Sequence, residues 1–232
     1  MNAEFHTRHN FPDGKSLARA LADAVAGDLG DAITNRDEAV LALSGGATPK
    51  RFLTELSKRD VAWSKVTLTL VDERWVPPTH ERSNEKLVRD FLMNGPASRA
   101  RFAELYYDAA TPEQGLQHIV TSVPETIDVA VLGLGPDGHT ASFFPDGDNL
   151  AEATDPRNPQ PVISMRASGA GEPRMTLTLA KLLTSDVLYL HIEGRDKSDV
   201  LEKAFEDGPI NDVPIRSLLR QKQCPLGIYW AP

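Results

Sequence analysis

An acid–base pair stands directly after a buried-strand pattern in the middle of the chain. Apart from Asp128, residues 127–132 are apolar and include several β-branched side chains, and they give way to the turn sequence GLGPDGHT at 133–140. This turn holds Asp137 and His139. Imidazole titrates near neutral pH and a carboxylate can orient it, so the pair could activate a water molecule. A single turn histidine is more often structural, and the catalytic interpretation therefore depends on the neighbouring loops.

A glycine loop follows a second buried-strand pattern, the apolar run at residues 39–43. The loop consists of Ser44, Gly45, Gly46, Ala47, Thr48 and Pro49, and a helix is expected to begin at its proline. Backbone N–H groups and hydroxyls in such a loop can converge on a phosphate. The loop is neither a Walker A sequence nor a dinucleotide fingerprint, and a plain turn that uses glycine for positive φ explains it equally well.

Charged residues end the third strand pattern, at residues 66–71. The guanidinium of Arg74 suits a carboxylate, a phosphate or a developing oxyanion, while Asp72 could hold that arginine or accept hydroxyl protons. For Glu73, between them, we expect a solvated salt bridge in a loop. Charges and two prolines are expected to stop the strand here.

Two more cations are candidates for anion binding. Arg174 begins an alternating run at residues 174–179 that predicts a short strand, with its first side chain either in the site or at the rim. Lys197 follows the strand pattern at 187–192 and precedes a helix expected over 198–205. A lysine at a helix start opposes the helix dipole, and a bound anion would relieve that cost.

The elements that must position these loops alternate regularly along the chain. An amphipathic helix after the N-terminal segment is expected to be capped by Ser16, and another by Ser83. Strands separated by helices predict right-handed βαβ units and a mostly parallel sheet covered on both faces, as one domain over residues 1–232. Because parallel strands end at one edge, the four loops should meet there.

Composition excludes several classes of protein. The chain has 232 residues and a formal net charge of -8, which argues against binding nucleic acid or an anionic membrane. No apolar window is long enough for a membrane span and no secretory signal is evident, so we expect a cytoplasmic protein. Cys224 is the only cysteine, which excludes an internal disulfide, and we expect it in the core. The histidines are scattered, so no metal site is expected.

Five sequence blocks, in order, resemble the signatures of 6-phosphogluconolactonases. They are LALSGGATPKRF, VDERWVP followed by SNEKLVRDFL, GLGPDGHTASFFP, PRMTLTL and GRDKSDVL, and the resemblance covers the chain from about Leu41 to Lys197, which lies in the last block. The resemblance implies hydrolysis of 6-phospho-D-glucono-1,5-lactone to 6-phosphogluconate, in the oxidative pentose phosphate pathway, with no cofactor or metal. It also implies the three-layer αβα, Rossmann-like fold of the sugar-phosphate isomerases and deaminases.

Roles for the candidate residues follow from this resemblance. His139 would be the general base, and Asp137 would either orient it or bind substrate hydroxyls. Arg74 would stabilise the oxyanion or anchor the substrate. The substrate and its phosphate would be held by Ser44, Gly45, Gly46, Thr48, Asp72, Arg174 and Lys197. The expected partner is the sugar phosphate lactone alone, with the chain a monomer or a weak homo-oligomer.

Two other functions remain alternatives. Glucosamine-6-phosphate deaminases share the glycine loop, the aspartate, the Asp-Gly-His turn and the lysine, but their motif ends in a glutamate where this chain has Phe144. An aromatic side chain cannot relay the second proton that a deaminase or an aldose–ketose isomerase needs. A noncatalytic sugar-phosphate sensor would keep the loop and the cations without needing His139, but such sensors usually carry an added DNA-binding segment, for which this acidic chain is expected to have no room.

Overall fold

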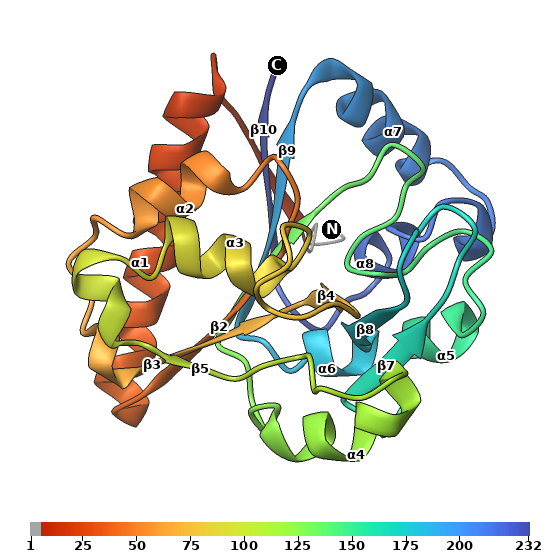
Figure 1. Cartoon of the computed structure of the whole chain (residues 1–232). Helices are drawn as coiled ribbons and strands as arrows, with labels where there is room; N and C mark the ends of the chain where they lie inside the picture. Colours follow the sequence, from red (N-terminus) through yellow and green to blue (C-terminus); the bar gives the residue numbers. More distant parts are fainter. Residues whose placement is uncertain (1–5) are drawn as a thin grey trace.

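A seven-stranded parallel sheet forms the centre of the molecule, in a computed structural model that describes residues 6–232 (Figure 1). Its strand order is β1-β10-β9-β6-β2-β3-β5, and every neighbouring pair is parallel. The strands are β1 (His6–Asn10), β2 (Ala39–Leu43), β3 (Val66–Leu70), β5 (Arg101–Phe102), β6 (Val129–Gly133), β9 (Val187–Glu193) and β10 (Leu226–Ala231). The central strands are buried apolar runs, as strands covered on both faces require.

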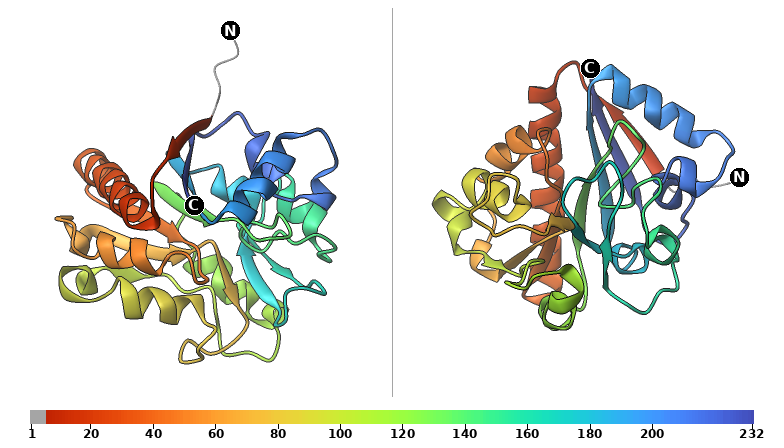
Figure 2. Two further views of the ribbon diagram at one scale, coloured as in Figure 1. Left: turned by 90° about the horizontal axis from the view of Figure 1, so that it is seen from above. Right: turned by 45° about the vertical axis from the view of Figure 1, so that its right-hand side comes forward.

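Helices cover both faces of this sheet, which confirms the predicted three-layer αβα architecture (Figure 2). One layer holds α1 (Gly14–Arg36), α2 (Lys50–Leu56) and α3 (Asn84–Phe91). The opposite layer holds α7 (Arg195–Phe205) and α8 (Arg216–Leu219), together with a second, smaller sheet. Three short 3₁₀ turns, at Trp63–Lys65, Gly95–Arg99 and Ile210–Asp212, complete the connections.

The second sheet was not predicted from the sequence. It is antiparallel, in the order β4-β8-β7, with β4 (Asp72–Arg74), β8 (Arg174–Leu177) and β7 (Val162–Met165). Beside it lie α4 (Pro112–Ser122), α5 (Leu150–Thr154) and α6 (Leu179–Leu182). The prediction that Asp72–Arg74 form a loop is therefore wrong. The chain changes sheets at Val71, whose N–H donates to Leu43 in the large sheet and whose carbonyl accepts from Leu177 in the small one.

Helix ends differ in detail from the sequence prediction. Asp13, not Ser16, caps α1: its carboxylate accepts a hydrogen bond of 2.7 Å from the Ser16 backbone N–H. Ser16 is the third helical residue, where an N-cap side chain finds its donor. Ser83 caps α3 as predicted. Helix α7 begins at Arg195, so Lys197 lies within its first turn.

The strand order reverses direction at the centre of the large sheet. From β2 the chain moves to β3 on one side, and β6 later pairs with the other side of β2. Ligands of open α/β sheets bind outside the carboxyl ends of the strands at such a reversal. Cys224 is buried as predicted, with 1 % of its surface exposed. No helix within residues 6–232 has the length and apolarity needed to cross a membrane.

Candidate active site

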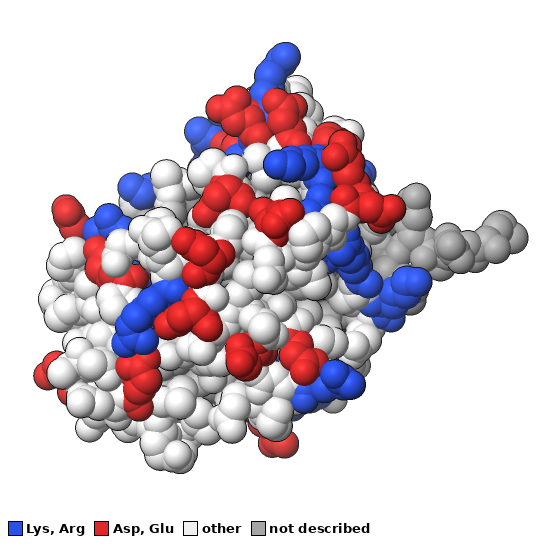
Figure 3. All heavy atoms as spheres, turned by 90° about the vertical axis from the view of Figure 1, so that its right-hand side faces the viewer, with Lys and Arg blue, Asp and Glu red and all other residues white. Residues whose placement is uncertain are grey.

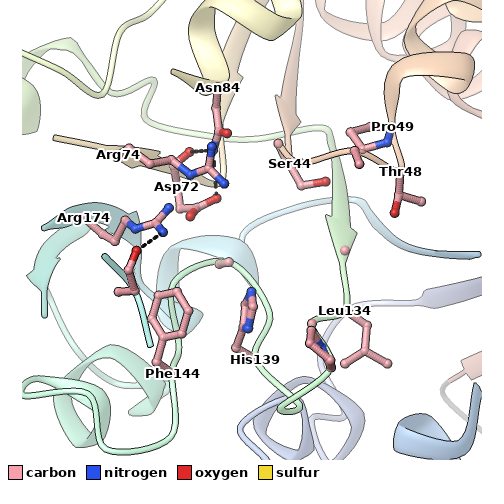
Figure 4. Close-up of a pocket in the computed structure, with 18 of the residues that line it drawn as sticks. Ser44, Thr48, Pro49, Asp72, Arg74, Asn84, Leu134, His139, Phe144 and Arg174 are labelled. Carbon is pink, nitrogen blue, oxygen red and sulfur yellow. Dashed lines mark hydrogen bonds between the residues drawn. The ribbon is translucent and has the colours of Figure 1, made fainter. Parts of the chain in front are cut away.

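A cavity of about 280 Å³ opens at this reversal point (Figure 4). Small-molecule sites have volumes of roughly 300 to 1,000 Å³, and this cavity is close to the lower end of that range. Its size therefore suits one small metabolite. The segments that follow β2, β3, β6 and β9 all contribute to its wall. Of the predicted site residues, the cavity is lined by Ser44, Gly45, Gly46, Thr48, Asp72, Arg74, His139, Arg174 and Lys197.

The predicted acid–base pair is formed. His139 Nδ1 lies 2.5 Å from Asp137 Oδ1, and the His139 backbone N–H donates to the same oxygen at 3.2 Å. Although burial raises the pKa of Asp137, the hydrogen bonds from His139 outweigh it and hold the pKa below its ordinary value. An ionised Asp137 accepts a hydrogen bond from the Nδ1–H group of His139. The other ring nitrogen, Nε2, then carries the free lone pair. Asp137 itself is not among the residues that line the cavity.

Glycine makes this tight turn possible at two positions. A Cβ at Gly135 would lie 2.1 Å from His139 Cε1, so only glycine leaves room for the ring. Gly138 has φ +83°, in the left-handed region that favours glycine. The turn is closed by a 2.8 Å hydrogen bond from the Gly135 N–H to the His139 carbonyl. The backbone therefore fixes the imidazole before any substrate binds.

The glycine loop and Lys197 meet as predicted. Lys197 Nζ donates to Thr48 Oγ1 at 3.0 Å. Burial lowers the pKa of Lys197, against the opposing effect of Glu193. The Ser44 backbone N–H is committed to the Val131 carbonyl, so Ser44 can offer a ligand only its hydroxyl. Gly46 adopts φ +96°, which explains a glycine there.

Arg74 and Arg174 lie directly opposite one another on the neighbouring antiparallel strands β4 and β8 of the small sheet. Like charges placed opposite one another repel, and burial together with this repulsion lowers the pKa of Arg174, although Asp72 opposes the change. The Arg174 guanidinium also lies 5.5 Å from the Phe144 ring centre and donates to the Ala170 carbonyl at 2.6 Å. Figure 4 shows both arginines on the side away from Thr48. Arg174 is thus grouped with Arg74 rather than with Lys197.

Glu73 does not form the solvated salt bridge expected from the sequence. Its side chain is buried and accepts hydrogen bonds from the Ser83 hydroxyl and from the backbone N–H groups of Arg74, Asn84 and Glu85, at 2.7 to 2.9 Å. Burial raises the pKa of Glu73 to about 7, although these four hydrogen bonds lower it. The carboxylate thereby binds the start of α3 to β4, a long-range contact that no local pattern reveals.

Sequence reasoning missed three polar residues that line the cavity, Arg82, Asn84 and His191, and also Ser142, which contacts Asp72 from outside the lining. Ser142 donates from its hydroxyl to Asp72 Oδ2 at 2.6 Å, and the Asn84 amide donates to Asp72 from the other side. His191 lines the cavity at the end of β9, with Nε2 3.1 Å from Glu193 Oε1. No sequence signal pointed to His191, because it lies within an apolar strand pattern. Asn84 directly follows Ser83, the predicted helix cap, and could have been proposed from that position.

Phe144 lines the cavity. Its ring centre is 4.5 Å from that of His139. The histidine therefore contacts both a carboxylate, at Asp137, and an apolar ring, at Phe144. Within residues 6–232, no group of three or more His, Cys, Asp or Glu side chains could hold a metal ion.

Comparison with known proteins gives consistent results. The family model described as glucosamine-6-phosphate isomerases/6-phosphogluconolactonase matches residues 12–226. The chain is 51 % identical over 227 residues to a 6-phosphogluconolactonase of Rhizobium meliloti, covering 97 % of this chain and 98 % of the relative. It is 41 % identical to one of Pseudomonas aeruginosa over 218 residues, with 93 % and 90 % covered.

Solved structures show the same relationship. A 6-phosphogluconolactonase from Shewanella baltica superposes with a TM-score of 0.95 at 35 % identity, covering 98 % of each chain. A monomeric glucosamine-6-phosphate deaminase superposes with a TM-score of 0.77 at 18 % identity, covering 97 % of each chain. At that identity the deaminase shares the fold, and the site residues must distinguish the two chemistries.

Proposed function

The chain belongs to the family of glucosamine-6-phosphate isomerases and 6-phosphogluconolactonases, and from this premise we propose how it works. It is an enzyme that hydrolyses 6-phospho-D-glucono-1,5-lactone to 6-phospho-D-gluconate in the oxidative pentose phosphate pathway. The observation that carries the mechanism is His139, which lines the cavity and is hydrogen-bonded to Asp137 behind it, together with the cations Arg74, Arg174 and Lys197 in the cavity lining.

His139 acts as the general base. Its Nε2 takes a proton from a water molecule as the water oxygen attacks the lactone carbonyl carbon, and Asp137 stabilises the imidazolium that results. The carbonyl π bond becomes an oxyanion. When this tetrahedral intermediate collapses, the bond from the carbonyl carbon to the ring oxygen breaks, and the imidazolium returns its proton to that oxygen. The product is the open-chain hydroxy acid.

Arg74 and Arg174 stabilise the negative charge that develops on the carbonyl oxygen. The two guanidinium groups repel one another across β4 and β8, and an oxyanion between them relieves this repulsion. The interaction strengthens as the charge forms, which is the condition for lowering the barrier. The opposed arginines therefore support the placement of the reacting carbonyl at the small sheet.

The phosphate occupies the other end of the cavity. Lys197 supplies the positive charge, and the Thr48 hydroxyl and the Gly45 and Gly46 backbone supply donors. This group does not react, but its binding orients the lactone ring toward His139. Placing the phosphate here differs from the sequence-based interpretation, which gave it Arg174 as a second cationic partner.

Phe144 supports lactone hydrolysis over sugar deamination. Ring opening of an amino sugar and the isomerisation that follows it require proton transfers by a second acid–base group. The only carboxylate in this turn is Asp137, which is already hydrogen-bonded to His139. An apolar ring at 144 leaves the histidine one acidic partner, which is sufficient for hydrolysis. We further propose that the chain works in the cytoplasm and that it is a monomer or a weak homo-oligomer. Sedimentation velocity would test the oligomeric state.

A coupled assay tests the proposed function. The purified protein is added to freshly generated 6-phosphogluconolactone at neutral pH, and the decay is compared with spontaneous hydrolysis. Glucosamine 6-phosphate and ribose 5-phosphate are assayed in parallel. We expect rapid lactone decay and no change in either sugar. Lactone decay at the spontaneous rate, with ammonia released from glucosamine 6-phosphate, would overturn the proposal.

A further inference from the structure

Two loops border the cavity beside the opposed arginines. One consists of residues 75–83, between β4 and α3, and the other is the hairpin loop 166–173, between β7 and β8. The first loop contributes Arg82 to the cavity lining, and the second contributes Gly169 and Ala170. Arg82 is therefore a cation of the lining to which the proposed mechanism gives no role.

Each loop holds one of the two opposed arginines through a backbone carbonyl. Arg74 Nη1 donates to the Arg82 carbonyl at 2.5 Å. Arg174 Nη2 donates to the Ala170 carbonyl at 2.6 Å. Hydrogen bonds weaken steeply when donor and acceptor lose their alignment, so each guanidinium follows the position of its loop. The separation of the two loops thus helps to set the separation of the two guanidinium groups.

An ion pair joins these loops through their side chains. Arg82 Nε lies 2.9 Å from Glu172 Oε1. Among residues 6–232, the other polar contact between the loops is a 2.7 Å hydrogen bond from the Trp75 backbone N–H to the Pro173 carbonyl, where both loops leave the small sheet. The ion pair is therefore the polar contact that connects the loops beyond the sheet.

Glu172 is ionised at neutral pH and can hold its partner by charge. Burial raises its pKa, but its own backbone N–H and the charges of Arg82, Arg174 and Arg74 outweigh burial and hold the pKa below its ordinary value. Three arginines in one place repel each other, and an ionised carboxylate among them offsets part of that repulsion. The carboxylate therefore favours the arrangement in which the two loops stay close.

We propose that the Arg82–Glu172 ion pair is a positioning contact for the opposed arginines. It holds the two loops together and keeps Arg74 and Arg174 at the spacing that an oxyanion between them requires. Neither member of the pair has to touch the substrate, because it acts through the Arg82 and Ala170 carbonyls. Donors that are fixed before the charge develops stabilise the transition state best, so loosened loops should slow turnover more than they weaken binding. This inference rests on the proposed function.

A double-mutant cycle in the lactone assay tests this inference. Arg82→Met and Glu172→Gln each remove the ion pair and keep a side chain of similar length. We expect each to lower kcat by about fivefold, as befits a partly exposed pair, with KM nearly unchanged. The double variant should be no slower than either single variant, because all three lack the same interaction. Arg82→Lys, which keeps the charge, should retain most of the wild-type kcat.

Glu113→Gln is the matched control. Arg166, at the start of the same hairpin loop, pairs with Glu113 on α4. This variant therefore breaks an arginine–glutamate pair of loop 166–173 without releasing loop 75–83, and it should leave kcat and KM unchanged. Circular dichroism at the assay temperature shows that each variant is folded, so that a lower kcat does not reflect a loss of folded protein.

Three results would overturn the inference in an active wild-type enzyme. A raised KM in Arg82→Met, with both constants unchanged in Glu172→Gln, would mean that Arg82 binds the substrate directly. Effects on kcat that multiply in the double variant would mean that the two residues act independently of their ion pair. Unchanged kcat in all three variants would mean that the pair positions nothing. If the wild-type chain itself does not accelerate lactone hydrolysis, the proposed function fails, and this inference fails with it.

Discussion

At the scale of single residues, the chemistry depends on groups that are held before substrate arrives. His139 is hydrogen-bonded through Nδ1 to Asp137, and Gly135 leaves the room that the ring needs. Arg74 and Arg174 are opposed on neighbouring strands. None of these arrangements requires substrate to form, so the cost of orienting the catalytic groups is met during folding.

His139→Ala should remove nearly all lactonase activity while 6-phosphogluconate still binds. General-base assistance is worth about 10²- to 10⁴-fold, and the imidazole is not a phosphate ligand in our scheme. Steady-state kinetics and calorimetric titration of the product measure the two effects. His118→Ala, an exposed histidine on α4, is the control and should be fully active. Full activity of His139→Ala would exclude it as the base.

Asp137→Asn should lower kcat and leave KM nearly unchanged, because Asp137 contacts His139 and does not line the cavity. The effect should be smaller than that of His139→Ala, since an amide oxygen still accepts the Nδ1 proton. A rise in KM without a change in kcat would show instead that Asp137 binds substrate hydroxyls. Kinetics across a range of lactone concentrations separates these two roles.

Lys197→Ala should chiefly raise KM, by about tenfold or more, because a charge-assisted hydrogen bond to the phosphate is worth roughly 1.5 to 3 kcal/mol. Lys203→Ala is the control: it removes an exposed lysine from the same helix and should leave KM unchanged. An unchanged KM in Lys197→Ala would place the phosphate elsewhere, most simply at the arginines.

At the scale of elements, the small sheet decides the shape of the site. Strand β4 leaves the large sheet at Val71 and pairs with β8, which sets Arg74 opposite Arg174. Glu73, between Asp72 and Arg74, ties the same strand to α3. One three-residue strand therefore positions Asp72, a proposed substrate ligand, Arg74, a proposed oxyanion ligand, and the start of α3.

An ion pair between elements gives this molecule a measurable pH dependence. Arg166, next to the end of β7, donates to both Glu113 carboxylate oxygens on α4, and these hydrogen bonds hold the pKa of Glu113 well below its ordinary value of 4.5. A depressed carboxylate pKa adds stability above the unfolded-state pKa, and that stability is lost as the pH falls through the folded-state pKa. The pair is partly exposed, so its contribution is small.

Glu113→Gln should therefore lower the free energy of unfolding at pH 7 by less than about 1 kcal/mol. The difference from the wild type should shrink as the pH is lowered below about 4.5. Urea denaturation at several pH values measures it. Glu81→Gln, at an exposed carboxylate, is the control and should show no such trend. A difference that stays constant down to pH 3 would contradict the assignment.

At the scale of the whole molecule, the excess of acid coexists with a site built for an anion. The formal net charge is -8, yet three cationic side chains of the proposed site line the cavity. On the face shown in Figure 3, basic side chains stand beside acidic ones and form no continuous stripe of the kind that a phosphate backbone requires. The proposed anion site therefore depends on cations placed locally in the cavity lining and not on the net charge of the chain.

The two sheets should unfold together. They share Val71, and the tryptophans at positions 63, 75 and 230 report on different parts of the molecule. We expect one cooperative transition in urea, with fluorescence and far-UV circular dichroism curves that coincide. This would support the prediction of one domain over residues 1–232. Two separated transitions would mean that the small sheet and its helices form an independent unit.

The sequence by itself determined the parallel sheet, its helical layers and the loops that carry chemistry. Those conclusions rest on patterns within single elements: apolar runs such as 39–43, the glycines that follow them, and the Asp137–His139 spacing. Because parallel strands end at one edge, these local patterns were also enough to predict that the loops meet.

Tertiary structure alone decided which charged groups face one another. Strand β4 forms only because β8, about 100 residues further along the chain, offers its edge, and this pairing brings Arg174 to Arg74 instead of Lys197. Glu73 is buried because α3 presents its N–H groups there. Such contacts join residues that are distant in sequence, so no periodicity or spacing within one segment contains them.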